Sequence, residues 1–395
     1  MTHQKTLRRV VMSAALAALL ASSVVACAGN SGAGGSPAPS PTTTTSNGPM
    51  DAATTAKLDA IIDNALTTTG IPGAIVGIWS PSGDYTSAAG VADTTTGAPM
   101  TTELATRIGS ATKPFTVTVV LQLVDEGKVE LDDPISKYVE GVTDGDEITV
   151  RQLAGMRSGL PEYSATEAFV ADYLADTGTS FTPQRLLGYV ADQPVGFAPG
   201  TQFEYSNTNT ILLGLLVERV TGGSLAEAIT DRILKPLKLE HTLFPIGSEM
   251  PDPHARGYTN QTADGSVADA TDYNPSWGWA AGAMSSNLQD LGRWVPALVN
   301  GDLLSAETQR ERLRTEPIEE GDDSVGYGLG LFNINGWIGH NGSLPGYKTV
   351  TVYLPEQETT LVVLINTDID GETDLVDALM APITELISPA HIYGN

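Results

Sequence analysis

Hydrophobic residues recur at helical spacing where the folded part of the chain begins. Over residues 50–69 the apolar positions 58, 61, 62, 65 and 66 share one helical face, and Gly-Ile-Pro-Gly follows. This pattern predicts a helix that ends near Gly70. Residues 74–79 and 84–92 are β-rich runs separated by Ser-Pro-Ser-Gly, which predicts two strands joined by a turn.

The C-terminal part repeats these elements in the opposite order. Residues 347–354 and 359–366 are β-rich runs around a Pro-Glu turn, and residues 374–387 have the spacing of a helix. Because a helix and two strands occur at both ends, we expect one sheet assembled from both termini.

Helical patterns dominate the middle of the chain. The clearest cover residues 115–125, 211–220, 224–234 and 288–299. We therefore expect an α/β (α+β) fold with two subdomains. The sheet subdomain comes from about residues 51–105 and 316–390, and the mostly helical subdomain from about residues 106–315.

Composition and charge limit the functions that fit. Of the 395 residues, 41% are hydrophobic and 17% are charged, which excludes wholesale disorder and allows a large core. Asp and Glu number 47 against 21 Lys and Arg, for a net charge of -26. Phosphate contacts require Lys or Arg, so nucleic acid is not expected as a partner. Solubility is the simplest interpretation of the acidity.

The N-terminus has the pattern of a secretory signal. Lys5, Arg8 and Arg9 precede an uncharged apolar run over residues 10–26, which closes on Val-Val-Ala before Cys27. This ending resembles the bacterial lipobox. It implies a signal peptide over residues 1–26, lipidation of Cys27 and an extracytoplasmic lipoprotein anchored to the bacterial cell membrane. The alternative is an ordinary signal peptide with an incidental cysteine.

The residues after the signal predict a tether. Residues 27–50 are rich in Gly, Ser, Pro and Thr and offer little to bury. Cys27 is the only cysteine, so an internal disulfide framework is excluded. The folded domain is expected over residues 51–395.

A hydroxyl and an amine lie three residues apart at a predicted helix start. Pro114 has no N–H for the helix interior, so it places Ser110 at the start. The spacing puts Ser110 and Lys113 on one face, and an anion is favoured near the N–H of Ser110. A desolvated Lys113 loses its proton readily and could accept that of Ser110. One such pair is also expected by chance in a chain of this length.

A Tyr-x-Asn sequence is the second candidate motif. Tyr205-Ser206-Asn207 leads into the apolar helix predicted over residues 211–220, which gives rigid support. The same pattern begins at Tyr258, in a turn-rich stretch, and at Tyr393, in the terminal tail. This context favours Tyr205.

The third candidate is His340-Asn341-Gly342-Ser343, which enters the late strand region. Its glycine would allow a ligand to approach the backbone closely. The five histidines do not have the spacing of zinc ligands, so no metal site is expected. The Gly-x-Ser-x-Gly sequence of a nucleophile elbow is also missing.

Together, Ser110-x-x-Lys113, Tyr205-x-Asn207 and His340-x-Gly342 resemble the motifs of the penicillin-recognising serine hydrolases. The chain is most similar to the branch with class C β-lactamases, low-molecular-weight D-alanyl-D-alanine carboxypeptidases, and related esterases and D-aminopeptidases. The resemblance spans about residues 56–388 and includes the flanking stretches 131–135, 153–160, 197–216 and 282–286.

This resemblance implies a β-lactamase/transpeptidase-like fold and acyl transfer through an acyl-enzyme, without metal or organic cofactor. Ser110 would be the acylated nucleophile and Lys113 its proton partner. Tyr205 would share the acid and base duties, protonating the leaving group. His340, where many relatives carry Lys, would supply polar or positive character beside the Tyr205 hydroxyl.

The resemblance also implies how the substrate is held. Asn207 would bond the acyl-side amide, and Asn341 and Gly342 would contact the substrate. The backbone N–H groups of Ser110 and Ser343 would form the oxyanion hole, worth about 3 kcal/mol per donor.

One departure from the family pattern concerns the substrate. Carboxypeptidase members usually carry Thr or Ser where this chain has Asn341, and an arginine shortly before it. Residues 315–339 contain no Lys or Arg, and they include Glu316, Glu319, Glu320, Asp322 and Asp323. An anionic C-terminus would require a cation there, which argues against strict D-Ala-D-Ala carboxypeptidase activity. Lys348 is the candidate substitute.

The function expected from the sequence is therefore hydrolysis of ester or amide bonds, in small molecules or cell-wall peptides. Two alternatives remain open: a penicillin-binding lipoprotein that traps its ligand with little turnover, and a weak β-lactamase.

Overall fold

One antiparallel sheet is built from both ends of the chain. The computed structural model describes residues 48–371 and 374–394, in which the main sheet has nine strands in the order β3-β2-β1-β13-β12-β11-β10-β9-β8. The N-terminal strand β1 pairs with the C-terminal strand β13 along its length, so the predicted joining of the two termini is confirmed. The bounds are β1 Gly73–Ser80, β2 Gly83–Asp93, β3 Ala98–Pro99, β8 Glu316–Glu319, β9 Asp322–Tyr327, β10 Phe332–Ile334, β11 Trp337–Leu344, β12 Tyr347–Leu354 and β13 Thr359–Ile365.

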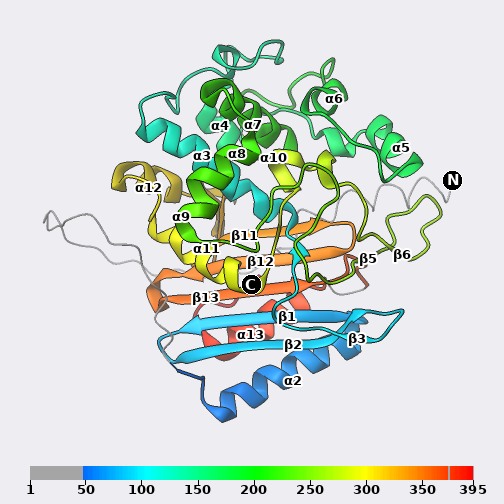
Figure 1. Cartoon of the computed structure of the whole chain (residues 1–395). Helices are drawn as coiled ribbons and strands as arrows, with labels where there is room; N and C mark the ends of the chain where they lie inside the picture. The colour runs from blue at the N-terminus through cyan, green and yellow to red at the C-terminus, as the bar shows by residue number, and fades with distance from the viewer. Residues whose placement is uncertain (1–47, 372–373, 395) are drawn as a thin grey trace, which may run out of the picture.

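Two terminal helices, α2 (Ala52–Thr69) and α13 (Asp377–Ile387), cover one face of this sheet (Figure 1). The carboxylate of Asp51 caps α2 by accepting the N–H groups of the first turn, and Gly70 ends the helix in the left-handed region at φ 76. Apolar side chains of α2 and α13 form one core with those of the central strands. The helices predicted over residues 50–69 and 374–387 are thus present.

The opposite face carries the middle of the chain. Helix α11 (Leu288–Asn300) packs on β1, β12 and β13, and α3 (Lys113–Asp125) is buried nearly all round. Phe115 of α3 stacks on Trp294 of α11 with 4.0 Å between ring centroids. The other elements are α4 (Val150–Ala154), α5 (Glu167–Ala175), α6 (Pro183–Gly188), α7 (Asn207–Thr221), α10 (Trp279–Gly282), α12 (Ala306–Leu313), β4 (Thr106–Arg107), β5 (Tyr258–Thr259), β6 (Ala268–Asp269) and β7 (Ser285–Ser286).

One predicted helix contains a π-helical turn. The helix predicted over residues 224–234 is present, but α8 (Leu225–Ile229) continues as a π-helical turn over Thr230–Leu234 and then as the short α9 (Lys235–Leu237). Pro236 in α9 has no N–H to donate to the carbonyl of Arg232, four residues earlier, and its ring crowds that carbonyl. The Arg232 carbonyl instead accepts from the side chain of Gln122 on α3.

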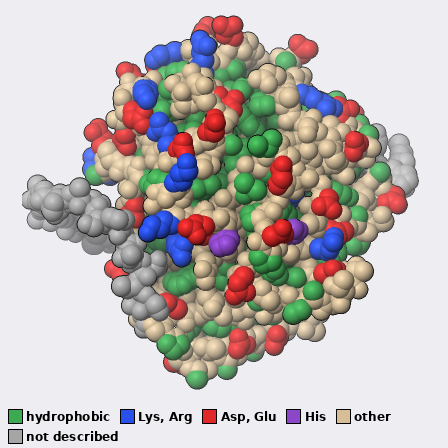
Figure 2. Space-filling model, in the orientation of Figure 1, with side chains coloured by type: hydrophobic (Ala, Val, Ile, Leu, Met, Phe, Trp, Pro, Cys, Tyr) green, Lys and Arg blue, Asp and Glu red, His purple; other side chains and the backbone are tan. Residues whose placement is uncertain are grey.

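Acidic side chains (red) are spread over the whole face of the molecule shown in Figure 2. Within residues 48–371 and 374–394, no helix has the length and hydrophobicity needed to cross a bilayer. The expected signal peptide, Cys27 and all but the end of the expected tether lie outside the described residues.

Candidate active site

Ser110 lies in a 3₁₀ turn, η1 (Gly109–Thr112), that runs directly into α3. Pro114 occupies the first turn of α3, as the sequence predicts. Gly109 has φ 52, and a Cβ there would come within 2.6 Å of the backbone N of Ser343. Glycine is therefore needed at position 109 both for its backbone conformation and for the close approach of β11.

The strand that leads to Ser110 is held by a buried arginine. Nη2 of Arg107 donates to the carbonyls of Ser248, Thr271 and Tyr273 at 2.9–3.2 Å. On its other side β4 pairs with β7. These contacts fix the backbone just before the nucleophile, as a precise site requires.

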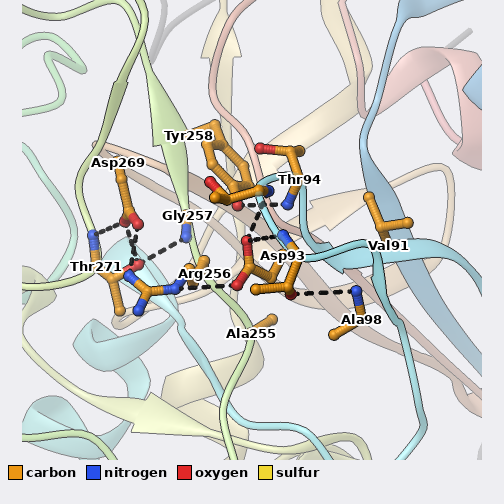
Figure 3. Close-up of polar contacts among 12 residues, drawn as sticks. Val91, Asp93, Thr94, Ala98, Ala255, Arg256, Gly257, Tyr258, Asp269 and Thr271 are labelled. Carbon is orange, nitrogen blue, oxygen red and sulfur yellow. Dashed lines mark hydrogen bonds and ion pairs between the residues drawn. The ribbon is translucent and has the colours of Figure 1, made fainter.

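Figure 3 shows how the segment around Thr271, whose carbonyl accepts from Arg107, is itself held in place. The carboxylate of Asp269 accepts from the N–H and hydroxyl of Thr271 and pairs with Arg256 at 2.6 Å. Arg256 also reaches Asp93 at the end of β2, and the Tyr258 hydroxyl accepts an N–H from the turn after Asp93. The chain around Thr271 is thereby tied to the sheet.

Lys113 is fully buried and close to Ser110. Its Nζ lies 2.9 Å from Oγ of Ser110, 2.7 Å from Oδ1 of Asn207 and 2.9 Å from the carbonyl oxygen of Ala281. Burial lowers the pKa of Lys113 to about 7, and the negative charge of Glu162 opposes this shift. A substantial fraction of the protein therefore carries a neutral Lys113 at physiological pH.

The partners of Lys113 determine where its lone pair points. The oxygens of Asn207 and Ala281 can only accept, so they take the two N–H bonds of a neutral amine. The lone pair is then left for the hydroxyl proton of Ser110. This arrangement can activate the serine without any further rearrangement.

Tyr205 lies in the loop before α7, with its hydroxyl buried beside this pair. Nζ of Lys113 is 4.7 Å from the centroid of its ring. Burial raises the pKa of Tyr205 strongly, the nearby Ser110 side chain lowers it somewhat, and Glu162 raises it further. The phenol is therefore protonated, and Ser110 is the hydrogen-bonding side chain beside its hydroxyl, although their geometry is not that of an ordinary hydrogen bond.

The backbone of β11 passes directly beside the nucleophile. A Cβ on Gly342 would lie 1.9 Å from the carbonyl oxygen of Ile108 and 2.9 Å from the N of Ser110, so only glycine fits. Backbone N and O of Ser343 face Gly109. The N–H groups of Ser110 and Ser343 thus lie in one small region, as an oxyanion hole requires.

His340 is buried in the same cluster, but it is neutral. Burial and the positive charge of Lys113 lower the pKa of His340 to about 3. The sequence analysis expects His340 to supply polar or positive character. Because the imidazole is neutral, it supplies polar character only. Its Nδ1 contacts the carbonyl of Asn341 and its Nε2 lies 3.3 Å from the hydroxyl of Tyr327, whereas no hydrogen bond joins it to Tyr205.

The two remaining candidates lie differently. The side chain of Asn341 is exposed, on the opposite face of β11 from His340. Lys348 is buried and its Nζ binds Asp370 at 2.6 Å and Asp374 at 2.8 Å. The suggestion that Lys348 supplies a substrate-binding cation is therefore wrong, because its charge is already paired.

Three neighbours of the motif residues are not predicted by the sequence. Glu162 accepts the backbone N–H of Asn207, Tyr327 contacts His340, and Ala281 accepts from Lys113. For Glu162 and Ala281 the one available signal is their place in the sequence, directly beside the family-like stretches 153–160 and 282–286.

Comparison with known proteins assigns the family. The β-lactamase family model matches residues 58–382. The chain belongs to the β-lactamase family. The D-stereospecific amidohydrolase from a Streptomyces species is 32% identical in sequence with a TM-score of 0.77, and the match covers 85% of this chain and 99% of that one. D-amino acid amidase from Ochrobactrum anthropi SV3 has a TM-score of 0.77 at 26% identity, covering 86% of this chain and 100% of that one.

Among curated proteins, protein flp of Staphylococcus aureus is similar to this β-lactamase-family chain. The two are 28% identical over 284 residues, which is 70% of this chain and 55% of flp. The match thus spans little more than half the length of that relative. Family, fold and the Ser110–Lys113 pair make the matched domain a serine hydrolase that acts by acyl transfer on amide or ester bonds.

We expect activity to rise with pH as Lys113 loses its proton. Since the neutral amine is the form that accepts the proton of Ser110, kcat/KM for an activated ester should climb through about pH 7 and level off above it. His340, with a pKa of about 3, should add no inflection above about pH 5. Initial rates from about pH 5 to 9 test this. A profile that is flat or falling through pH 7 would contradict the assignment.

Proposed function

We propose that this domain hydrolyses amides and short peptides of D-amino acids that carry a free α-ammonium group, through an acyl-enzyme on Ser110. The observation that carries this proposal is the charge of the site. Among the described residues Glu162 is the charged side chain that acts on the pKa of both Lys113 and Tyr205. The two structural relatives named for D-stereospecific chemistry support the same substrate class.

Two cations of the described chain that could bind a substrate carboxylate are already paired. Lys348 is paired with two aspartates, and Arg157, which reaches the stretch before β11, pairs with Glu316 at 2.9 Å. A free substrate carboxylate would meet Glu162 without a compensating cation, which is unfavourable in a desolvated site. Amides, esters and N-terminal residues avoid this cost. This supports amidase or aminopeptidase action over carboxypeptidase action.

Glu162 is placed to meet a substrate cation. Its two oxygens accept the backbone N–H groups of Ser164 and Asn207, which fixes the carboxylate beside the second motif and leaves further lone pairs. Oδ1 of Asn207 is committed to Lys113, so its amide N–H groups are left for the substrate. An α-ammonium beside Glu162 and a carbonyl beside Asn207 would orient one amino-acid residue over Ser110.

Acylation then requires three proton transfers. The hydroxyl proton of Ser110 passes to the lone pair of Lys113 while Oγ attacks the carbonyl carbon, and the N–H groups of Ser110 and Ser343 bind the resulting oxyanion. Tyr205 gives its proton to the leaving nitrogen as the C–N bond breaks, and Lys113 returns a proton to the phenolate. Ser110 is left as an ester and the amine departs neutral.

Deacylation uses the same groups in reverse. A water molecule takes the place of the leaving amine, and its proton passes through Tyr205 to the regenerated neutral Lys113 as its oxygen attacks the ester. Oγ of Ser110 leaves and recovers a proton from Lys113. One water is consumed, and the free D-amino acid is released.

The substrate class is tested with matched compounds and one variant. Wild type should cleave D-phenylalanine p-nitroanilide faster than the L-isomer and faster than the N-acetylated D-compound. Glu162→Gln should lower kcat/KM for the free amine by about tenfold, the loss of a charge-assisted contact of about 1.5 kcal/mol, and change the N-acetyl substrate little. Glu167→Gln, an exposed change on α5, is the control.

Preference for the L-isomer or for the N-acetyl compound would contradict this substrate class. An equal loss of kcat/KM on the free amine and on the N-acetyl compound in Glu162→Gln would mean that Glu162 acts only by supporting Asn207.

We further propose that the domain is a lipoprotein, held outside the cytoplasm by a lipid on Cys27. The lipobox-like ending at residues 24–27 and the Gly/Ser/Pro/Thr-rich residues 28–47 support this proposal, since such a tether leaves a folded domain free of the bilayer.

Expression of the full chain in a bacterial host tests the anchor. The wild-type protein should fractionate with membranes and incorporate labelled fatty acid, and Cys27→Ser should lose the label and leave the membrane fraction. Retention of Cys27→Ser in the membranes without label would contradict lipid anchoring.

A further inference from the structure

Tyr327 is a buried tyrosine at the end of β9 that none of the three motifs includes. Its hydroxyl lies 3.3 Å from Nε2 of His340. Burial raises the pKa of Tyr327 well above its ordinary value, so the hydroxyl keeps its proton. The phenol and the imidazole therefore form one neutral pair inside the catalytic cluster.

Hydrogen-bond chemistry determines which atom donates. The carbonyl of Asn341 can only accept, so the contact at Nδ1 places the imidazole proton on that atom. In the neutral ring Nε2 is then the acceptor, and it takes the hydroxyl proton of Tyr327. Both nitrogens of His340 are satisfied in this arrangement.

Tyr205 is the other phenol beside the same imidazole. The rings of Tyr205 and His340 are 6.1 Å apart between centroids, and those of Tyr205 and Tyr327 are 6.3 Å apart, edge to face. The Tyr205 hydroxyl is buried and has no hydrogen bond of ordinary geometry among the described residues, and Ser110 is the polar side chain that acts on it. A buried hydroxyl without a well-formed hydrogen bond is costly, so it would bind a free acceptor nearby. Nε2 of His340 is such an acceptor, but it is already occupied by the hydroxyl of Tyr327.

We propose that Tyr327 is a positioning residue that occupies the Nε2 acceptor of His340 and so leaves the hydroxyl proton of Tyr205 available for the leaving group. The inference rests on the serine hydrolase chemistry of the family and not on the proposed substrate class. Tyr327 itself touches no reacting atom.

The surrounding rings hold this geometry in place. Phe332 of β10 contacts Tyr327, His340 and Tyr205, with centroid separations of 4.6, 5.1 and 6.2 Å.

Few polar groups face His340 from the elements packed against it. They are Lys113 of α3, Tyr205, Tyr327, the carbonyl of Asn341, and the Thr351 hydroxyl of β12, which donates to the His340 carbonyl. Nothing else described competes for Nε2.

Removing the Tyr327 hydroxyl should redirect the Tyr205 proton. In Tyr327→Phe the ring and its packing remain, but Nε2 of His340 becomes a buried acceptor without a partner. The hydroxyl of Tyr205 would satisfy it and would be lost to the leaving group. A poor leaving group, which needs protonation, suffers from this loss, whereas a good one departs as an anion.

The test is a series of aryl acetates with the same acyl group and phenol leaving groups from activated to unactivated. We expect Tyr327→Phe to lower kcat/KM by about tenfold or more for the least activated ester and by less than about twofold for p-nitrophenyl acetate. The change should steepen the dependence of the rate on leaving-group acidity. Thermal unfolding monitors whether the variant is folded.

Two further variants complete the experiment. Tyr138→Phe removes another partly buried hydroxyl, bonded to Asp133 away from the site, and should leave the leaving-group dependence unchanged. In a His340→Ala background, Tyr327→Phe should add no further steepening, because it acts through the imidazole.

An equal loss across the ester series, no loss at any ester, or an undiminished effect in the His340→Ala background would each overturn the inference. Failure of the D-amino-acid substrates would leave these outcomes untouched, since the acetates carry no amino group.

Discussion

The burial of one amine organises the whole site. Lys113 is fully buried, and the cost of desolvating its charge brings its pKa to about 7. Its two carbonyl-type acceptors then leave the lone pair for Ser110. If the amine were exposed, the same residues would form an ordinary ammonium beside an unreactive serine. The activation of the nucleophile is thus a consequence of packing.

The fold supplies that packing from three distant segments. The turn at Ser110 and strand β11 meet through Gly109 and Gly342, where any side chain would collide with backbone. The loop before α7 adds Tyr205, and the first residue of α7 is Asn207. Because His340 and the tyrosines are neutral as well, Glu162 and the titrating Lys113 dominate the charge of the pocket. An acidic protein thereby keeps its reaction centre close to neutral.

Local sequence signals predict the framework of this site well. Pro114 marks the helix start that holds Ser110, and the strand patterns at both ends predict the central pairing of β1 with β13. The motif residues Ser110, Lys113, Tyr205, Asn207 and His340 do come together. The π-helical turn ahead of Pro236 follows from a local rule as well, and could have been foreseen.

The partners of those residues could not be foreseen in the same way. That Lys348 is paired with Asp370 and Asp374, or that His340 is neutral and bonded to Tyr327, depends on burial and on contacts between residues distant in sequence. A pattern along the chain specifies which residue types are present, but the charge state of each depends on what surrounds it in three dimensions.

The most direct test of this account is an NMR titration of the lysine side chains in the folded protein, with the Lys113 resonance assigned by its absence from Lys113→Ala. Lys113 should titrate with a pKa of about 7. A Lys113 that stays protonated to the ordinary value of 10.5 in the folded protein would contradict it.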